Sequence, residues 1–371
     1  MVATRLIKLS RLSWFKLRAL AVIGAVALLG YVVTRSFAAG PLAAFEPETA
    51  ALSAGATTAT VSGASGSGVV KFTAGTTPTP SSTPSSSPAA CASSTQHVPD
   101  GPDGMGGCWP GPSNTGVPAG ITLTNYTGSC TITAAGTVID SKLINNCDRL
   151  DIGASATNVL IKNSRINTVV YNDDVGSFNG SVTLQDSEVD AGSVTYGAVT
   201  FKNITVIRSD IRGGQHNVLC ASNCKIYDSY LHDPYVQGAT HNNGFISNGG
   251  NDYLIEHSTV SCNVPTNNTG GGCSGDVSWF GDFGPISYAT LNRSLLTANT
   301  GLAYCLYAGH DTKPYGSQAN HITVTNNIFQ RGTNNKCGAY GPDTNYWHDT
   351  TGQPPPNSVW SNNKWSDGTA L

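Results

Sequence analysis

The feature that most constrains this chain is a six-residue pattern that occurs nine times. It reads apolar, any residue, a polar residue of the Asn or Asp kind, Ser or Asn, any residue, apolar, as in 161–166 and 184–189. Neighbouring copies lie 20 to 36 residues apart. A unit this short cannot bury its own apolar face, so the units must stack. The small polar position falls at Ser141, Ser164, Ser187, Ser209, Ser229, Ser258, Ser294, Asn327 and Asn363.

The residues around each copy alternate as in a β-strand. Apolar residues stand two apart before the polar pair, as in Val182 and Leu184 or Ile204 and Val206, which turns one face inward. No stretch of the repeats has a helical period. The sequence therefore predicts an all-β parallel β-helix of about nine or more coils. A β-sandwich with coincidental Asn-Ser turns is the alternative, and it would require nine aligned copies by chance. The Ser or Asn pair predicts a corner with a hydrogen-bonded column.

The N-terminus resembles an export signal. Residues 1–18 contain five basic residues and no acidic one, and 19–33 are apolar. The small residues around 36–39 suit cleavage, whereas Arg35 suits an uncleaved anchor. We interpret 19–40 as a signal peptide or a membrane anchor, which in either case places the rest outside the cytosol. A membrane contact is expected only if the segment is uncleaved.

Charge and motifs exclude several classes of protein. Without residues 1–18, the chain has 15 basic and 23 acidic residues and therefore a net charge of −8. Only 12% of the residues are charged, so no nucleic-acid partner is expected. The chain contains no phosphate-binding loop, dinucleotide fingerprint or zinc-type motif. We expect no cofactor and no metal.

Composition divides the rest of the chain into three parts. Residues 44–74 are rich in strand formers, and residues 75–90 form a Pro/Ser/Thr linker. Residues 91–371 are the predicted β-helix, with 91–136 as its N-terminal cap. The first part resembles a fragment of the jelly-roll carbohydrate-binding modules in its Phe-Glu-x-Glu start and its Gly-x-x-Val-x-Phe end, although an ordered spacer would have the same composition.

Ten cysteines in an exported chain predict disulfides. Cys305 and Cys337 are 32 residues apart where the repeat step is 33, so they should pair on adjacent coils. The connectivity of the others stays open. Cys220 with Cys224 and Cys262 with Cys273 flank tight turns, while Cys91 with Cys108 and Cys130 with Cys147 would pin the cap. No cysteine pair is joined by histidines at ligand spacing, which argues against a metal site.

Several motifs resemble those of the exported right-handed parallel β-helix proteins of actinobacteria and related bacteria. They include the Cys-Trp-Pro-Gly-Pro stretch at 108–112, the Asn-Cys-Lys-Ile-Tyr-Asp-Ser stretch at 223–229 and the Phe-Gln-Arg-Gly-Thr stretch at 329–333. The likeness covers about residues 108–371. It implies a right-handed coil, export, and an architecture shared with pectate-lyase-like and polygalacturonase-like enzymes.

The later repeats are longer, at 234–243, 263–281, 299–318 and 331–356. Such loops build surfaces and carry binding residues. They bring eight aromatic residues toward one side, where rings can stack on sugars, although aromatics that cap the end of the coil would look the same. These residues are Tyr235, Trp279, Tyr304, Tyr307, Tyr315, Tyr340, Tyr346 and Trp347.

One polar row stands out in the repeat register. Asp190, Arg212 and His232 each follow the last inward apolar residue of successive coils, so they should form an outward vertical row. Asp233, His216 and His241 lie near it in sequence. Histidine transfers protons near neutral pH, and arginine grips carboxylates. A solvated ladder of stacked opposite charges is the structural alternative.

Three functions fit these residues. A lyase would use Arg212 as the clamp on a uronate carboxylate and His232 or His241 as the base, with Asp233 beside them. A glycosidase would use the pair Asp276 and Asp282. Against these, the polygalacturonase motifs and the calcium-binding acidic cluster of pectate lyases are missing. The third is a non-enzymatic surface protein that binds glycans or acts as an adhesin.

We therefore predict an exported or cell-surface protein, expected to be a monomer, that binds or acts on extracellular polysaccharide. Arg212, His232 and His241 should converge at the floor of a cleft. The side chains expected to contact the sugar are Asp190, His216, Tyr235, Trp279, Tyr304 and Tyr307.

Overall fold

The computed structural model describes residues 56–60, 68–72, 90–173, 178–309, 312–343 and 354–371, and the segments expected at 1–18 and 19–40 lie outside these ranges. The chain divides into two compact units, Met1–Ser85 and Ser86–Leu371. In the first, β1 (Ala56–Thr60) and β2 (Gly68–Phe72) pair antiparallel within the region expected to be rich in strands. Over the described ranges no helix is long and apolar enough to cross a membrane.

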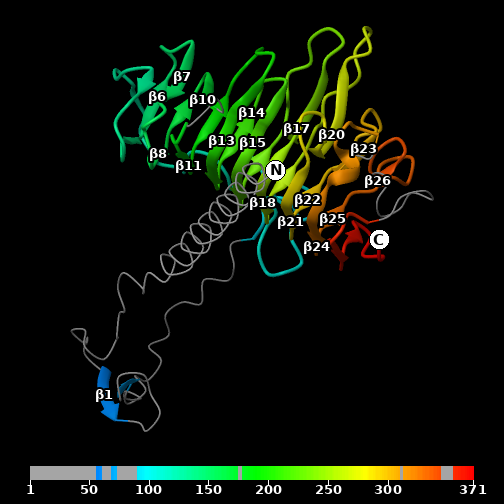
Figure 1. The fold of residues 1–371 in the computed structure, drawn as a ribbon, viewed down its shortest axis with the longest axis horizontal. Coiled ribbons are helices and arrows are strands. Elements are labelled where there is room, and N and C mark those ends of the chain that lie inside the picture. The colour runs from blue at the N-terminus through cyan, green and yellow to red at the C-terminus, as the bar shows by residue number, and fades with distance from the viewer. Residues whose placement is uncertain (1–55, 61–67, 73–89, 174–177, 310–311, 344–353) are drawn as a thin grey trace, which may run out of the picture. The chain divides into compact units, whose positions relative to one another are not determined.

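The second unit is a stack of β coils with three faces (Figure 1). Every strand pairs in parallel with the strand one coil away, because each coil repeats the same path. Face A contains β4 (Thr131–Ile132), β7 (Arg149–Ile152), β10 (Val169–Asn172), the start of β13 (Gly197–Ile207), the start of β15 (His216–Tyr227), β17 (His241–Ser247), β20 (Gly272–Trp279), β23 (Tyr304–Ala308) and β26 (Gly341–Asp343).

Face B continues from face A, since β13 and β15 run through both. Its other strands are β5 (Val138–Asp140), β8 (Val159–Lys162), β11 (Val182–Gln185), β18 (Gly250–Glu256), β21 (Ile286–Asn292), β24 (Asn320–Thr325) and β27 (Val359–Ser361). Face C contains β3 (Thr124–Asn125), β6 (Lys142–Ile144), β9 (Arg165–Ile166), β12 (Glu188–Asp190), β14 (Asp210–Arg212), β16 (Tyr230–Leu231), β19 (Thr259–Val260), β22 (Leu295–Leu296), β25 (Ile328–Phe329) and β28 (Lys364–Trp365). The helical turn η3 (Gly316–Gln318) lies between β23 and β24. The fold is the predicted parallel β-helix.

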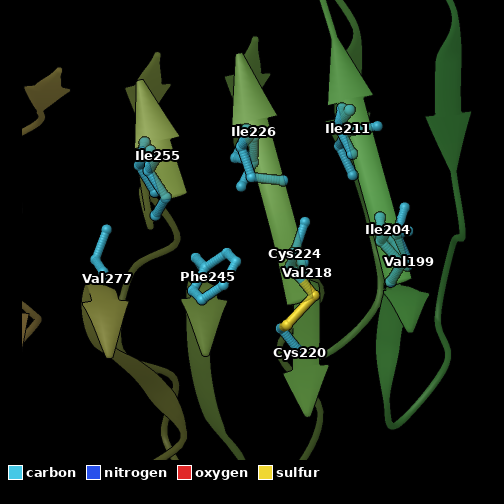
Figure 2. Packing of buried hydrophobic residues seen from close by; sticks show 14 of the residues in the cluster. Val199, Ile204, Ile211, Val218, Cys220, Cys224, Ile226, Phe245, Ile255 and Val277 are labelled. Atoms are coloured by element: carbon cyan, nitrogen blue, oxygen red, sulfur yellow. A yellow bond between two sulfur atoms is a disulfide. The ribbon is translucent and has the colours of Figure 1, made fainter. Parts of the chain in front are cut away.

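Apolar side chains fill the coil in vertical columns (Figure 2). On face B, Val206, Ile226 and Ile255 lie above one another and are fully buried. On face A, Val199, Val218 and Phe245 do the same. Strand alternation alone puts these positions inside, which is why the sequence pattern identified them.

The predicted column of small polar residues is present from Ser164 onward. Each backbone N–H donates to the side-chain oxygen one coil further on, as Ser209 does to Ser229 at 3.1 Å and Ser229 to Ser258 at 3.1 Å. Each serine hydroxyl from Ser164 to Ser294 in turn donates to the carbonyl two residues earlier, as Ser229 does to Tyr227 at 2.6 Å. Asn327 and Asn363 continue the column with their side-chain oxygens.

The first copy of the pattern lies one residue later in the stack than the sequence repeat predicts. Ile139 pairs with Ile161, and Lys142, rather than Ser141, donates its N–H to Ser164 at 3.0 Å. Ser141 instead has a φ of 54°, the conformation that Asn163 adopts in the next coil. The apolar pattern admitted either register, and burial decides it, because a shift of one residue exchanges the two faces of a strand. Ile139 is 4% exposed, whereas Val138 is 58% exposed.

All ten cysteines form disulfides. Cys305 pairs with Cys337, as the repeat step predicted, with the Cα atoms 5.8 Å apart. The other pairs are the sequence neighbours Cys91–Cys108, Cys130–Cys147, Cys220–Cys224 and Cys262–Cys273, and no cysteine is free. Five disulfides are typical of an oxidising, extracellular environment.

The first part of the segment expected to cap the N-terminal end does not lie over that end of the coil. Residues 91–116, here called the strap, cross face C of the later coils. The N–H of Gly116 donates to the carbonyl of Arg208 at 3.0 Å, and the carbonyl of His97 accepts from Gln330 at 2.7 Å. Between these ends, Trp109 packs with Leu295 and Ile328 and is 1% exposed. Burial of this indole explains why the strap lies along the stack.

Candidate functional site

A polar hollow of the β-helix lies on the outer surface of face A. It has a volume of about 370 Å³ and extends from β15 across β17 and β20 to β23. Because the side chains that line it come from successive coils, residues far apart in sequence lie side by side. They are Gln215, His216, His241, Asn243, Ile246, Asn248, Ser274, Phe280, Asp282, Tyr307 and Lys313.

A second hollow of about 300 Å³ continues the first one toward β26. The two share His241, Ser274 and Tyr307, and the second adds the ring of Tyr340, which is 69% exposed. Together they form one trough, here called the face-A groove. It runs from β15 to Tyr340, the residue directly before β26, and therefore spans five coils, roughly 19 Å at about 4.8 Å per coil.

The floor of the groove is a line of hydrogen-bonded side chains. Asn243 donates its amide to Nδ1 of His216 at 3.2 Å, and its oxygen accepts from the Ser278 hydroxyl at 2.5 Å. Burial lowers the pKa of His216 to about 3, so its imidazole is neutral at physiological pH. These hydrogen bonds hold the side chains of the floor in place. His241 is exposed, and its side chain has no partner among the described residues.

One wall of the groove combines a cation with aromatic rings. Lys313 pairs with Asp282 at 3.1 Å, and its ammonium lies 4.8 Å from the centre of the Phe280 ring. Tyr307 packs edge-on against Phe280, with the ring centroids 4.6 Å apart. Burial, together with Tyr304 and Tyr340, raises the pKa of Tyr307 to about 12, so its phenol stays protonated. The wall thus combines apolar ring faces with the ion pair of Lys313 and Asp282.

The predicted row Asp190–Arg212–His232 exists as a network of ion pairs on face C. Arg212 contacts Asp190 at 3.1 Å and Asp210 at 2.9 Å. His232 lies between Asp210, 3.1 Å from Nε2, and Asp233, 2.7 Å from Nδ1. The ring of Tyr230 also stacks on that of His232, with centroids 4.0 Å apart.

His232 is consequently a protonated, enclosed imidazole. Burial lowers its pKa, but the hydrogen bonds and charges of Asp210 and Asp233 outweigh burial and raise the pKa to about 9. A histidine that already carries its proton at neutral pH and is 8% exposed is poorly suited to act as a general base. The geometry therefore favours the structural ladder for this row.

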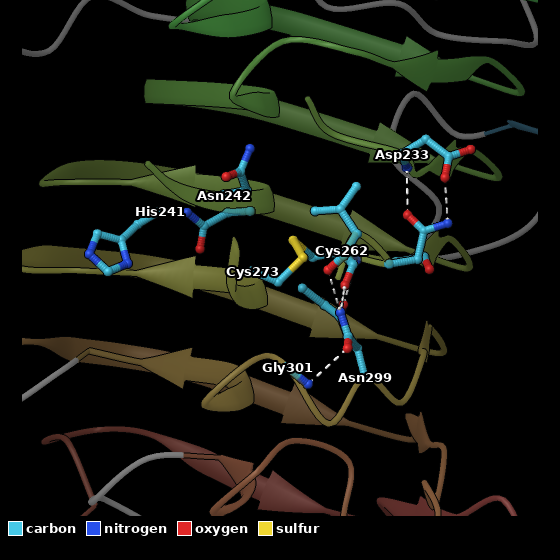
Figure 3. The surroundings of a disulfide bond; sticks show 12 residues. Asp233, His241, Asn242, Cys262, Cys273, Asn299 and Gly301 are labelled. Carbon is cyan, nitrogen blue, oxygen red and sulfur yellow. Dashed lines mark hydrogen bonds between the residues drawn. A yellow bond between two sulfur atoms is a disulfide. The ribbon is translucent and has the colours of Figure 1, made fainter. Parts of the chain in front are cut away.

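The structure does not bring Arg212 and His232 together with His241. Neither residue lines the face-A groove. Figure 3 shows His241 pointing away from the Cys262–Cys273 disulfide on the side opposite to Asp233, the partner of His232. The expected convergence of these three residues in one sugar site is therefore wrong, because Arg212 and His232 belong to the ion-pair network on face C and His241 lines the face-A groove.

Two further expectations are wrong. Asp276 and Asp282 do not form a pair of catalytic carboxylates, because Asp276 is fully buried and accepts a hydrogen bond from the backbone N–H of Cys262 at 2.7 Å. Burial raises its pKa well above the usual range. Trp279 is not on a cleft wall either, because it lies in the core at 0% exposure. Its position two residues after the inward Val277 was the sequence signal for this burial.

The remaining aromatic residues are distributed over the surface. Tyr235 is 41% exposed and lines neither hollow of the groove, whereas Tyr307 lines both. Tyr304 packs against Tyr307 with the ring centroids 5.5 Å apart, and Tyr315 is exposed. Tyr346 and Trp347 lie outside the described residues. Sequence reasoning missed Lys313, Asn243, Ser274 and Phe280, and no local motif marks them, since only the stacking of coils brings them together.

A metal site is not formed by the cluster that comes nearest to one. Asp276, Cys305 and Cys337 have ligand atoms within 4.8 Å of one another, but both sulfurs belong to one disulfide. No protein-family model, curated protein or solved structure matches the chain. Fold and site together define a disulfide-stapled parallel β-helix protein with a polar and aromatic groove along one face.

Proposed function

We propose that the protein is an exported β-helix protein that binds an extracellular polysaccharide in the face-A groove. The observation that carries this proposal is the groove itself, two adjoining hollows over successive coils with hydrogen-bonding side chains along the floor and rings on the wall. A polymer of sugars needs these two kinds of contact, because hydroxyl groups require polar partners and the carbon faces of the rings stack on aromatic side chains.

Cleavage of the polysaccharide by elimination is a second candidate function. It is favoured because exposed His241 and the ammonium of Lys313 line the same hollow. Lys313 would neutralise a uronate carboxylate while His241 takes the proton from the adjacent ring carbon. The carbon–oxygen bond to the next sugar then breaks, a carbon–carbon double bond forms, and the leaving oxygen is protonated by solvent. Hydrolysis by two carboxylates has less support, since Asp282 is the one carboxylate among the described residues that line the groove.

A panel of neutral and acidic polysaccharides tests both functions on the same samples. In affinity electrophoresis, at least one polysaccharide should retard the protein, and Tyr340→Ala and His241→Ala should each weaken binding by about five- to thirtyfold. Tyr235→Ala is the matched control, because it removes an exposed tyrosine outside the groove and should bind as the parent does. Elimination would appear as ultraviolet absorbance from the new double bond, which His241→Ala should abolish.

Retention of the parent by a polysaccharide with no effect of either groove variant would show that the groove is not the binding site. Retardation without any new absorbance would assign the groove to binding alone. If no polysaccharide in the panel retards the protein, the proposed function is wrong.

A further inference from the structure

A large apolar pocket lies at the corner between face A and face B, and the groove does not account for it. It has a volume of about 610 Å³, within the usual range for small-molecule sites. Its walls include Phe201, Leu219, Ala221, Phe283 and Pro285. Phe283 is 83% exposed, the most exposed large apolar side chain of the described residues. Among the residues that the structure describes, no charged side chain lines this corner pocket.

The bottom of the corner pocket is backbone that side chains cannot fill. Gly249 has a φ of 142° and Gly250 a φ of 127°, values that residues with a Cβ rarely adopt. A Cβ on Gly249 would lie 2.6 Å from the nitrogen of Gly284, and one on Gly250 would lie 2.0 Å from the carbonyl oxygen of Ala221. The close approach of these chain segments excludes larger residues, so the hollow is built into the turn.

The corner pocket adjoins the face-A groove. Asn248 lines both, and Asp282 in the groove is followed directly by Phe283 in the pocket. Leu219, a wall residue of the pocket, packs against the cluster of Ile246, Phe280 and Tyr307, whose members line the groove. A single ligand can therefore occupy both, with a polar part in the groove and an apolar part in the pocket.

We propose that the corner pocket binds an apolar substituent, an acyl chain or an aryl group, carried by the glycan in the groove. Covering the Phe283 ring and the Leu219 side chain removes apolar surface from water, which favours such a group. A charged substituent would find no counter-charge there, whereas the amides of Asn248 and Asn251 and the hydroxyl of Ser287 can hydrogen-bond the ester or ether oxygen that links substituent and sugar. The proposal rests on the proposed function for the polar half of the ligand.

Methyl, butyl and hexyl β-glucosides, used below the concentrations at which they form micelles, probe the pocket directly. In calorimetric titrations the affinity should rise by about two- to fourfold for each methylene group added. Phe283→Ala should remove most of this dependence on chain length, and Phe283→Leu should restore part of it. Tyr235→Ala, which alters an exposed ring outside the pocket, should leave the dependence unchanged.

The outcomes separate this proposal from the proposed function. Equal binding of the three glucosides, or a chain-length dependence that persists in Phe283→Ala, would overturn the apolar site even if polysaccharides bind the groove. Conversely, a dependence that needs Phe283 would support the pocket even if no polysaccharide binds. Sedimentation that changes in Phe283→Ala while glucoside binding does not would assign Phe283 to contact between two copies of the chain and refute the proposal.

Discussion

Removal of one hydroxyl from the serine column should destabilise the whole coil stack. In Ser229→Ala, the buried N–H of Ser209 loses its acceptor, and no other side chain of the described residues accepts from it. The carbonyl of Tyr227 loses the Ser229 hydroxyl but still accepts from the N–H of Arg208 at 3.0 Å. One backbone donor is therefore left buried without a partner, while one acceptor keeps half of its bonds.

The expected cost follows from this count. An orphaned buried donor costs about 1–3 kcal/mol, and the second lost bond adds roughly 1 kcal/mol, so the free energy of unfolding should fall by about 2–4 kcal/mol. The change in volume is small, since only one oxygen is removed. Urea denaturation with intact disulfides measures the difference, and an unchanged slope against urea shows that the same surface unfolds.

Ser193→Ala is the control, because Ser193 is exposed and outside the column. It should change the free energy of unfolding by no more than about 0.5 kcal/mol. If Ser229→Ala were as mild as this control, the column would not stabilise the corner in the way described, and the reasoning from orphaned donors would be refuted.

Two other predictions concern buried ionisable groups. The folded pKa of His232 is raised from its usual 6.5 to about 9, so its contribution to the free energy of unfolding is complete below pH 6.5 and is lost as the pH rises to about 9. Denaturation at several pH values should show a loss of about 3 kcal/mol over this range, and His232→Gln should remove this dependence on pH. A parent whose stability is flat over this range would contradict the ion-pair geometry. Burial raises the pKa of Asp276, so its contribution to the free energy of unfolding is complete at acidic pH and smaller at neutral pH. Asp276→Asn should therefore raise the free energy of unfolding at pH 7 by at least about 1 kcal/mol and change it little near pH 3.5. A variant that is destabilised at pH 7 would contradict a protonated carboxyl at this position.

Much of the fold could be predicted because the repeat carries its own register. Ser164 to Asn363 stack as the pattern indicated, and the 32-residue separation of Cys305 and Cys337 predicted their disulfide. The single error of register, at Ser141, arose where Val138 and Ile139 are both apolar, so that the pattern alone could not choose the inward one. The strap was not predictable from periodicity, since its position depends on the burial of Trp109 against coils almost 200 residues later.

The site was predicted less well, and the reasons are local. The pairing of β17 with β20 shifts register between Asn242 and Asn243, which interrupts the two-residue alternation near Asp276. Strict alternation from the inward Val277 would have put Asp276 outside, next to the solvent. For the row on face C, the repeat register predicts the outward positions of Arg212 and His232, but it does not indicate that Asp210 contacts both. Because Asp210 forms ion pairs with Arg212 and His232, these two candidate catalytic side chains are already paired within the protein.

The strap changes the order in which the coils of such a stack can unfold. In a solenoid whose units touch only their neighbours, the terminal coils can fray one at a time. Here the strap contacts Arg208, Leu295 and Gln330, and its Asp103 lies 3.2 Å from Nε2 of His257, so one segment of chain holds the coils from β14 to β25 together. Loss of the outer coils would also strip the strap from the inner ones, and the strap can dock only after these coils have formed. The later half of the β-helix, which carries the groove and the corner pocket, is therefore expected to open as one cooperative block rather than coil by coil.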